Sequence, residues 1–267
     1  MKKNILIIGC GKMGFSHIKS FINKDNINLY LYDKSKIKLN SYKKIKNVQL
    51  LKNLTLKTKF HFCIISTNCK HRFSLYKKLA LQKKIKIFLL EKFMFLIKKN
   101  YIYVNNHFDV KKIYNNVWGK YLFNEASKFN LKSYHSVKIF IEEGHLLSNL
   151  IHFMNFFSCY QKYSKILKLN LKLIKFKKQD ELKGNLILQY NKQKVIFQTK
   201  KIKNIFEMIF NIENEKNSLR IILKRNLNLF FYKNSKLLKI IRFPLASFFS
   251  YKIFKKNSLV PSFNEIL

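Results

Sequence analysis

The stretch Asn4-Ile-Leu-Ile-Ile-Gly-Cys-Gly-Lys-Met-Gly14 decides the fold of this chain. Its apolar run, Ile5 to Ile8, is typical of a buried parallel strand and ends in the pattern Gly9-x-Gly11-x-x-Gly14. In such a turn the first glycine allows a tight bend, the second admits a phosphate close to the backbone, and the third lets the next helix pack closely. The stretch therefore predicts a strand, a turn that binds a diphosphate, and a helix whose N-terminus faces that diphosphate.

An acidic residue follows the turn at the distance that a dinucleotide fold requires. Residues from about Lys12 to Asn23 have helical spacing, and a strand from Asn28 then ends at Asp33, 19 residues after Gly14. This is close to where the acid that binds the adenosine ribose is expected, although a surface aspartate at a strand end is the alternative. Lys34 and Lys36 are able to hold a 2′-phosphate, so NAD is favoured as the cofactor and NADP remains an alternative.

The next segments continue the alternation of strands and helices. Three further apolar runs predict strands and one predicts a helix: Val48 to Leu51, Phe60 to Ser66 and Ile85 to Leu90 for the strands, and Arg72 to Leu81 for the helix. Such alternation predicts a doubly wound parallel sheet of the Rossmann type, whose ligand crevice lies at the carboxyl ends of the strands. Candidate site residues follow these ends, namely Gly9, Asp33, Ser66 and Lys92.

Beyond about Asn115 the pattern changes, and we divide the chain into a dinucleotide-binding domain, 1–115, and an α+β substrate and dimerisation domain, 116–267. Leu146 to Ser158 has one apolar helical face. Strand-like runs with alternating polarity make up most of the remainder: Val137 to Glu142, Leu167 to Phe176, Asn185 to Tyr190, Lys194 to Thr199, Ile205 to Ile212, Leu219 to Leu223 and Leu227 to Tyr232. Hairpin connections at Asn191-Lys-Gln and Arg225-Asn favour a largely antiparallel, open sheet with one covered face.

The formal net charge of +41 raises the question of a nucleic-acid partner. Only four of the 54 basic residues are arginines, and the lysines are spread along the chain without a dense tract. A dedicated nucleic-acid binder more often concentrates its charge and uses arginine forks. The abundance of lysine, asparagine, isoleucine and phenylalanine resembles the bias of an AT-rich genome. We therefore expect only salt-sensitive adhesion to polyanions and no specific nucleic-acid partner.

Cysteine usage and hydropathy place the chain among cytoplasmic proteins without a membrane span. The four cysteines form neither a C-x-x-C pair nor the paired spacing of a zinc site, so reduced thiols and no metal are expected. No apolar run reaches the ~18 to 20 residues that a membrane helix requires.

Four separated motifs resemble those of the glucose-fructose oxidoreductase and inositol dehydrogenase (Gfo/Idh/MocA) family. They are Gly9-Cys-Gly-Lys-Met-Gly14 followed by His17, Ser66-Thr67-Asn68 followed by His71, Glu91-Lys92, and Gly144 eight residues before His152. The resemblance covers the first ~115 residues well and the helix near His152 moderately. It implies hydride transfer between NAD or NADP and a sugar, nucleotide sugar or polyol, and a homo-oligomer formed through the C-terminal sheet.

The resemblance also implies the roles of individual residues. Lys92 would polarise the substrate oxygen and His152 would take the proton, with His145 as the alternative base. The cofactor would be bound by Gly9, Gly11, Lys12, Met13, Gly14, Asp33, Ser66, Thr67, Asn68, His71 and Glu91. The substrate would contact Lys92, Trp118, Asn149 and Asn155.

Several positions depart from the family pattern. Phe93 replaces a proline, Ser148 replaces the aspartate four residues before His152, and Asn155 replaces an often acidic position. The chain stops at Pro261 to Leu267, where relatives begin a helix, so a shortened C-terminus is expected. These departures keep two alternatives open: a cofactor-binding sensor or scaffold without turnover, and, less favoured, a basic nucleic-acid-binding protein.

Overall fold

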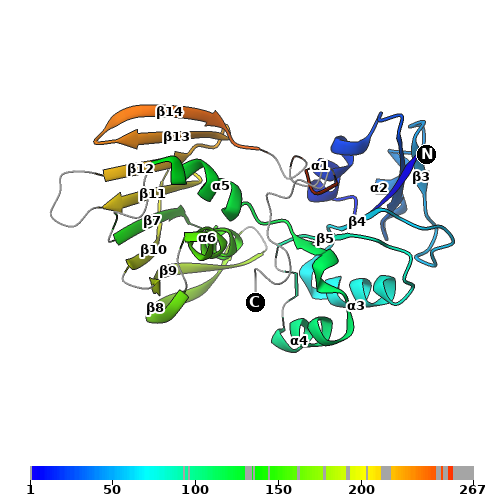
Figure 1. The fold of residues 1–267 in the computed structure, drawn as a ribbon, viewed down its shortest axis with the longest axis horizontal. Helices are drawn as coiled ribbons and strands as arrows, with labels where there is room; N and C mark the ends of the chain where they lie inside the picture. The colour runs from blue at the N-terminus through cyan, green and yellow to red at the C-terminus, as the bar shows by residue number, and fades with distance from the viewer. Residues whose placement is uncertain are drawn as a thin grey trace. The chain divides into compact units, whose positions relative to one another are not determined.

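The computed structural model describes residues 2–92, 94–95, 97–129, 134, 136–143, 145–160, 163–176, 179–190, 193–202, 204–211, 218–244, 248 and 252–254. The chain divides into two compact units, which are Met1–Trp118 with Leu245–Leu267 (unit 1) and Gly119–Pro244 (unit 2). Figure 1 shows the elements of both units. Four features named above lie outside the described residues: Phe93, Gly144, Asn191-Lys192 and the terminal stretch Pro261 to Leu267. The side chain of Ser148 is likewise outside the part that the structure describes.

Unit 1 contains a six-stranded, fully parallel sheet in the order β3-β2-β1-β4-β5-β6. Its strands are β1 (Lys3–Ile8), β2 (Ile27–Tyr32), β3 (Val48–Leu50), β4 (Phe62–Ile65), β5 (Phe88–Leu90) and β6 (Ile113–Asn115). The helices that connect them are α1 (Lys12–Phe21), α2 (Lys36–Asn40), α3 (Cys69–Ala80) and α4 (Lys98–His107), with a 3-10 turn, η1, at Val110–Lys112. The predicted Rossmann sheet is confirmed, and α2, α4 and β6 are additions to the elements that the sequence predicts.

Both faces of this sheet are covered, which explains the continuous apolar runs in the strands. Because successive side chains of a strand point to opposite faces, Leu6 and Ile8 join the core that contains Tyr76 and Leu79 of α3. On the other face, Phe21 of α1 meets Phe62 of β4 edge to face at 6.2 Å between ring centroids. Helices therefore pack on both sides of β1 and β4.

The strand order reverses between β1 and β4. From β1 the chain proceeds outward to β2 and β3, and from β4 it proceeds in the opposite direction to β5 and β6. In open α/β sheets, ligands bind outside the carboxyl ends of the strands at this switch point. Gly9 follows β1 and Ser66 follows β4, so both turns lie at the switch point.

Unit 2 contains an eight-stranded sheet in the order β14-β13-β12-β11-β7-β10-β9-β8. Its strands are β7 (Ser136–Glu142), β8 (Tyr163–Phe176), β9 (Gln179–Tyr190), β10 (Gln193–Lys200), β11 (Phe206–Asn211), β12 (Ser218–Leu223), β13 (Asn228–Lys233) and β14 (Lys236–Arg242). All neighbouring strands are antiparallel except β7 and β10, which run parallel. The largely antiparallel open sheet is confirmed, including the β9–β10 and β12–β13 hairpins. The edge strand β14 is not predicted by the sequence.

Two helices, α5 (Gly119–Ala126) and α6 (Leu146–Tyr160), belong to unit 2, together with the 3-10 turn η2 (Ser127–Phe129). Phe153 of α6 packs on Phe206 of β11 and Phe157 packs on Tyr190 of β9, so α6 covers the middle of one sheet face. The two helices approach closely at Gly119, where a Cβ atom would lie 2.1 Å from the His152 carbonyl oxygen. Only a residue without a side chain fits this crossing.

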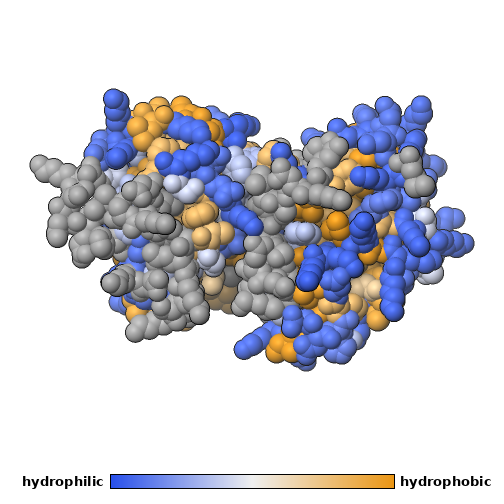
Figure 2. Space-filling model, in the orientation of Figure 1, coloured by the Kyte–Doolittle hydropathy of each residue, from blue (hydrophilic) through white to orange (hydrophobic). Residues whose placement is uncertain are grey.

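Charged side chains lie mainly on the surface. On the face shown in Figure 2, hydrophilic residues cover much of the described surface of both units, with smaller apolar patches between them. Apolar residues fill the interior, and a continuous hydrophobic cluster lies on the α3 side of the unit 1 sheet. The strongly basic composition is thus compatible with two ordinary hydrophobic cores.

We predict that Gly119→Ala destabilises unit 2. The added methyl group would lie 2.1 Å from the His152 carbonyl oxygen and 2.5 Å from the Phe156 nitrogen, and these backbone atoms cannot move away cheaply. Overpacking of this kind lowers the free energy of unfolding by about 1–3 kcal/mol. Urea unfolding would detect the loss as a lower midpoint. The matched control is Gly11→Ala, where the added Cβ meets no described atom within 4 Å. Equal urea midpoints for Gly119→Ala and the wild type would contradict the prediction.

Candidate functional site

The glycine turn has the geometry that its spacing predicts. Gly9 has a φ of +91°, a conformation that side chains disfavour, and this bend reverses the chain after β1. A Cβ on Gly14 would lie 1.7 Å from the Gly9 carbonyl oxygen, so α1 can start directly over the strand end only with glycine there. A Cβ on Gly11 would meet no described atom within 4 Å, which leaves its outer side open to a ligand.

The N-terminus of α1 is available to an anion. Gly11 is its N-cap, and no side chain of the described residues caps it. The free N–H groups of the first turn, which contains Lys12 and Met13, therefore carry a partial positive charge that favours a phosphate. Lys12 and Met13 are both exposed.

Asp33 braces the glycine turn from the end of β2. Its Oδ2 accepts a hydrogen bond from the Cys10 backbone N–H at 2.6 Å, and its Oδ1 accepts one from the Ser35 N–H at 2.8 Å. Each carboxylate oxygen retains a further lone pair. Asp33 can therefore fix the turn and still accept hydrogen bonds from ribose hydroxyls.

Cys10 is not a candidate nucleophile. Burial, followed by the nearby charge of Asp33, raises the pKa of the Cys10 thiol to about 12. The group therefore stays protonated near neutral pH, and the thiolate is the reactive form of cysteine. Its small, buried side chain fills the space behind the turn.

A cavity of about 350 Å³ opens at the switch point of the unit 1 sheet. Its lining brings together the glycine turn, the end of β2 and the turn after β4: Ile8, Gly9, Gly11, Tyr32, Asp33, Lys34, Lys38, Ser66, Thr67, Asn68, His71 and Leu75. Volumes of this size are typical of small-molecule sites. Of the two lysines named from the sequence, Lys34 lines the cavity among the described residues and Lys36 does not. Instead, Lys38 of α2, four residues after Lys34, lines the cavity. The sequence signal for this helix is Ser35, because serine is a common N-cap residue.

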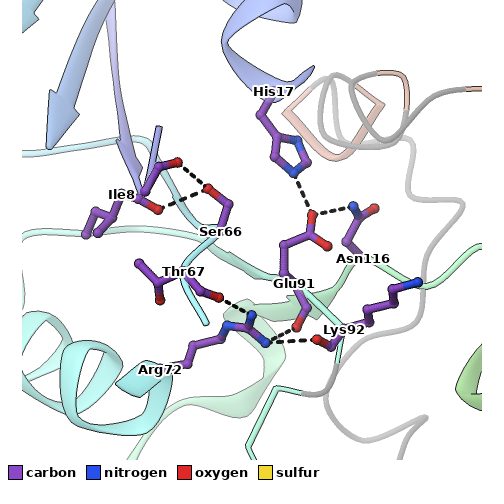
Figure 3. A network of polar contacts seen from close by, with 9 residues as sticks. Ile8, His17, Ser66, Thr67, Arg72, Glu91, Lys92 and Asn116 are labelled. Atoms are coloured by element: carbon purple, nitrogen blue, oxygen red, sulfur yellow. Dashed lines mark hydrogen bonds and ion pairs between the residues drawn. The ribbon is translucent and has the colours of Figure 1, made fainter. Parts of the chain in front are cut away.

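The Ser66-Thr67-Asn68 turn is tied to the glycine turn. The Ser66 hydroxyl lies 2.7 Å from the Gly9 carbonyl oxygen and 3.0 Å from that of Ile8, as Figure 3 shows. Asn68 caps α3, because its Oδ1 accepts a hydrogen bond from the Lys70 N–H at 2.9 Å. The two turns thus form one continuous wall of the cavity.

A buried polar network lies behind this wall. Glu91, at the end of β5, accepts hydrogen bonds from His17 Nε2 and Asn116 Nδ2, both at 2.6 Å from its Oε1 (Figure 3). Burial alone raises the pKa of Glu91, but the hydrogen bond and charge of His17, the hydrogen bond from Asn116 and the charge of Arg72 outweigh it, so the pKa is lowered. The Glu91 side chain is therefore ionised near neutral pH and connects α1 to the ends of β5 and β6.

Arg72 is the functional candidate that sequence reasoning missed. It is buried on α3, and its guanidinium donates hydrogen bonds to the carbonyl oxygens of Thr67, Glu91 and Lys92. Because these partners are main-chain atoms 5 to 20 residues away, no motif marks the residue. Lys92 itself is half-buried directly after Glu91.

The predicted site residues are shared between the units. Those from Gly9 to Trp118 belong to unit 1, whereas Asn149, His152 and Asn155 lie on α6 of unit 2. His152 is buried. Asn155 Oδ1 accepts a hydrogen bond from the Lys120 N–H at 2.9 Å, and Asn149 Nδ2 donates one to the His145 carbonyl oxygen at 2.8 Å. Asn155 is thus held by the start of α5, and Asn149 by the residue that precedes α6.

The described part of the chain contains neither a group of metal-binding side chains nor a membrane-spanning helix. There, no three His, Cys, Asp or Glu side chains are grouped so as to hold a metal ion. No described helix is long and apolar enough to cross a membrane.

We predict that Glu91→Gln changes the pH dependence of stability. Since the folded-state pKa of Glu91 lies below its ordinary value of 4.5, the ionised group stabilises the fold above about pH 4.5. This contribution is lost as the pH falls through the lowered pKa. At pH 7 the variant should unfold with a free energy about 1–3 kcal/mol lower than that of the wild type, and the gap should narrow below pH 4.5.

Urea unfolding at several pH values measures this gap. Asp25→Asn, which alters an exposed carboxylate, is the control and should leave the stability almost unchanged throughout. A gap between Glu91→Gln and wild type that is the same at pH 7 and below pH 4.5 would rule out the assigned role of the Glu91 charge.

No protein-family model and no curated protein sequence matches the chain. Among solved structures, the dehydrogenase MviM from Clostridium difficile aligns over 100% of this chain and 95% of its own, with a TM-score of 0.71 and 10% identity. Biliverdin reductase from Synechocystis sp., in complex with biliverdin and NADP+, aligns over 98% and 94%, with a TM-score of 0.72 and 10% identity.

GenD2 from gentamicin A biosynthesis, in complex with NAD, aligns over 99% of this chain and 90% of its own, with a TM-score of 0.70 and 9% identity. At such low identities the likeness establishes a common fold. The chain therefore has the two-part fold of these dehydrogenases and oxidoreductases, as the motif resemblance led us to expect.

Proposed function

We propose that the protein is an oxidoreductase that transfers a hydride between a nicotinamide dinucleotide and a sugar, nucleotide sugar or polyol. The observation that carries the proposal is the cavity at the strand-order reversal, where the glycine turn, Asp33 and the turn after β4 meet. Two proteins of the same fold were solved with NADP+ and with NAD. The sugar-like substrate rests on the motif resemblance alone, since biliverdin reductase shares the fold.

The described residues fit a dinucleotide. Gly11 leaves open space beside the uncapped N-terminus of α1, which suits the diphosphate. Asp33 is held with free lone pairs for ribose hydroxyls, and Asn68 and His71 line the cavity beside it. The bound cofactor would supply the hydride acceptor or donor. Four predicted cofactor residues do not line the cavity: Lys12, Met13, Gly14 and Glu91. The first three would act through the start of α1, and Glu91 through the polar network at the end of β5.

We assign Lys92 the role of polarising the substrate oxygen. Its ammonium group carries three donors, and the end of a parallel strand is where such groups meet a ligand. His152 is assigned the proton transfer, because an imidazole exchanges protons near neutral pH. Asn155 keeps its amide N–H₂ as a donor after accepting from Lys120, and Asn149 keeps its Oδ1 as an acceptor. These two and Trp118 are the proposed substrate contacts.

The second unit is also the proposed site of self-association. On the sheet face opposite α6, a cavity of about 340 Å³ is lined by Phe140, Ile187 and Ile196, together with Lys138, Lys168 and Lys200. Apolar side chains on an open sheet face suit burial against another copy. Sedimentation of the purified chain would report its oligomeric state, and a monomer at micromolar concentration would contradict this part of the proposal.

The first prediction concerns cofactor binding. NADH should bind the purified full chain with a dissociation constant between about 1 μM and 1 mM, measured by the fluorescence of the reduced nicotinamide. Because a strongly basic protein also attracts anions without specificity, the titration is repeated at about 0.5 M salt, where non-specific adhesion collapses. Absence of NADH and NADPH binding at millimolar concentration would reject the proposed function.

The second prediction concerns two lysines of α2, Lys36 and Lys38. Lys38→Gln should weaken NADPH binding about 3- to 10-fold and leave NADH binding unchanged, because only NADPH offers a 2′-phosphate to a charged donor. Lys36→Gln is the matched control, since Lys36 does not line the cavity among the described residues. This role of Lys38 would be refuted if Lys38→Gln weakened NADH and NADPH binding equally. It would also be refuted if Lys36→Gln weakened NADPH binding as much as Lys38→Gln does.

The third prediction separates turnover from binding. A panel of aldoses, polyols and nucleotide sugars is screened with NAD+ and NADP+, and formation of reduced nicotinamide is followed by absorbance. With the best substrate, Lys92→Met and His152→Asn should each lower kcat about 10²- to 10⁴-fold, the usual range for an acid or base. Tight cofactor binding without turnover on any substrate would instead favour a sensor or scaffold.

A further inference from the structure

Arg72 combines deep burial with contacts that an ordinary packing residue does not make. It lies in α3, one turn after the Asn68 cap, and is only 3% exposed. Taking a guanidinium out of water is costly unless its donors are satisfied. Burial lowers the pKa of Arg72, and the charge of Glu91 opposes this effect. An arginine nevertheless remains charged in proteins.

The contacts of Arg72 join two turns that the parallel ladder leaves separate. Its Nη1 lies 2.6 Å from the Glu91 carbonyl oxygen and 3.0 Å from that of Lys92, and its Nη2 donates to the Thr67 carbonyl oxygen. Figure 3 shows the guanidinium between the chain at Thr67 and the chain at Lys92. The last residues paired between β4 and β5 are Ile65 and Leu90. The carbonyl groups of Thr67, Glu91 and Lys92 come after these residues, so they lie just beyond the sheet.

Arg72 does not itself line the cavity. Among the described residues, the cavity wall contains Thr67 and Asn68 from the turn before α3, and His71 next to Arg72 in sequence. The guanidinium points to the main-chain oxygens of Thr67, Glu91 and Lys92 (Figure 3). Any influence on a ligand must therefore pass through the peptide groups of Thr67 and Lys92.

We propose that Arg72 is a positioning residue that fixes the Lys92 peptide relative to the Thr67 turn, and thereby sets the nicotinamide half of the cofactor site. The proposal rests on the proposed function. A planar fork with several donors can reach three carbonyls at once, whereas a lysine ammonium on a flexible stem can hold only part of this geometry. Arg72→Lys should therefore retain part of the effect and Arg72→Met should retain none.

The first arm of the test examines the contact itself without any ligand. Amide hydrogen exchange is measured on the full chain for wild type, Arg72→Lys and the control Lys78→Met, which alters an exposed residue of the same helix. Exchange in peptides covering 66–68 and 89–92 should accelerate about 10-fold or more in Arg72→Lys, with β1 unchanged. Unchanged exchange at both segments would overturn the proposal.

The second arm compares NADH with ADP-ribose, which has the same structure except that it lacks the nicotinamide ring. ADP-ribose affinity should stay within about twofold of wild type in both Arg72 variants. NADH affinity should fall about 3-fold in Arg72→Lys and about 10-fold or more in Arg72→Met, together with a smaller fluorescence change of the bound nicotinamide. Equal losses for ADP-ribose and NADH would reveal a purely structural role and overturn the proposal.

The outcomes separate the two proposals. If the wild type binds neither ligand, the oxidoreductase function fails, while the hydrogen-exchange arm still decides whether Arg72 links the two turns. If Arg72→Met does not fold, Arg72→Lys decides the ligand comparison alone. Wild-type NADH affinity and nicotinamide fluorescence in a folded Arg72→Lys with accelerated exchange would also overturn the proposal, because the link would then have no effect on the site.

Discussion

The close approach of Gly14 to the Gly9 carbonyl oxygen is the contact on which the site depends. A Cβ atom at Gly14 would lie 1.7 Å from that oxygen, so the start of α1 can lie over the end of β1 only because both residues are glycine. This placement aims the free N–H groups of α1 at the switch point of the sheet. The same carbonyl accepts the Ser66 hydroxyl, and Asp33 holds the intervening Cys10 N–H. Strands β1, β2 and β4 are thus braced at one point.

A second set of braces lies behind the first and uses buried charge. Glu91 forms hydrogen bonds with His17 of α1 and with Asn116, which follows β6. Arg72 donates hydrogen bonds to carbonyl groups that follow β4 and β5. Parallel strands lose their neighbours' hydrogen bonds where they end, and the freed main-chain groups must be satisfied there. Buried side chains satisfy some of them, which keeps the crevice edge rigid without closing it. The order of the crevice therefore comes from polar contacts as well as from the apolar sheet below.

The sequence predicts those parts of the structure that local patterns determine. The strand, turn and first helix follow from Ile5 to Gly14, and Asp33 follows from spacing, because tight turns restrict residue type strongly. The sequence does not predict α4 because it buries little besides Val104, nor α2 because it has only five residues. It does not predict β6 because lysines and asparagines flank Ile113 and Tyr114, which leaves no apolar run. The mostly exposed edge strand β14 gives no clear alternation. The contacts of Arg72 and the lining role of Lys38 depend on chain segments distant in sequence, which one-dimensional patterns do not register.

The basic residues of this chain contribute specific hydrogen bonds as well as overall charge. Lysine supplies nearly all of the positive charge, and most lysines of the described surface are exposed. Some lysines, such as Lys84 and Lys239, donate hydrogen bonds to defined acceptors, and all four arginines do so. Arg220 pairs with Glu207, Arg225 with Glu142, and Arg242 with the Asn226 carbonyl oxygen.

Arg72 is the buried member of this set and the one with the largest number of main-chain partners among those described above. A planar fork with several donors can reach three main-chain acceptors at once, which a single ammonium group does less well. At Arg72 the geometry of the donors is therefore required in addition to the charge. The contacts of Arg72, rather than the abundance of lysine, identify a basic residue that this fold constrains.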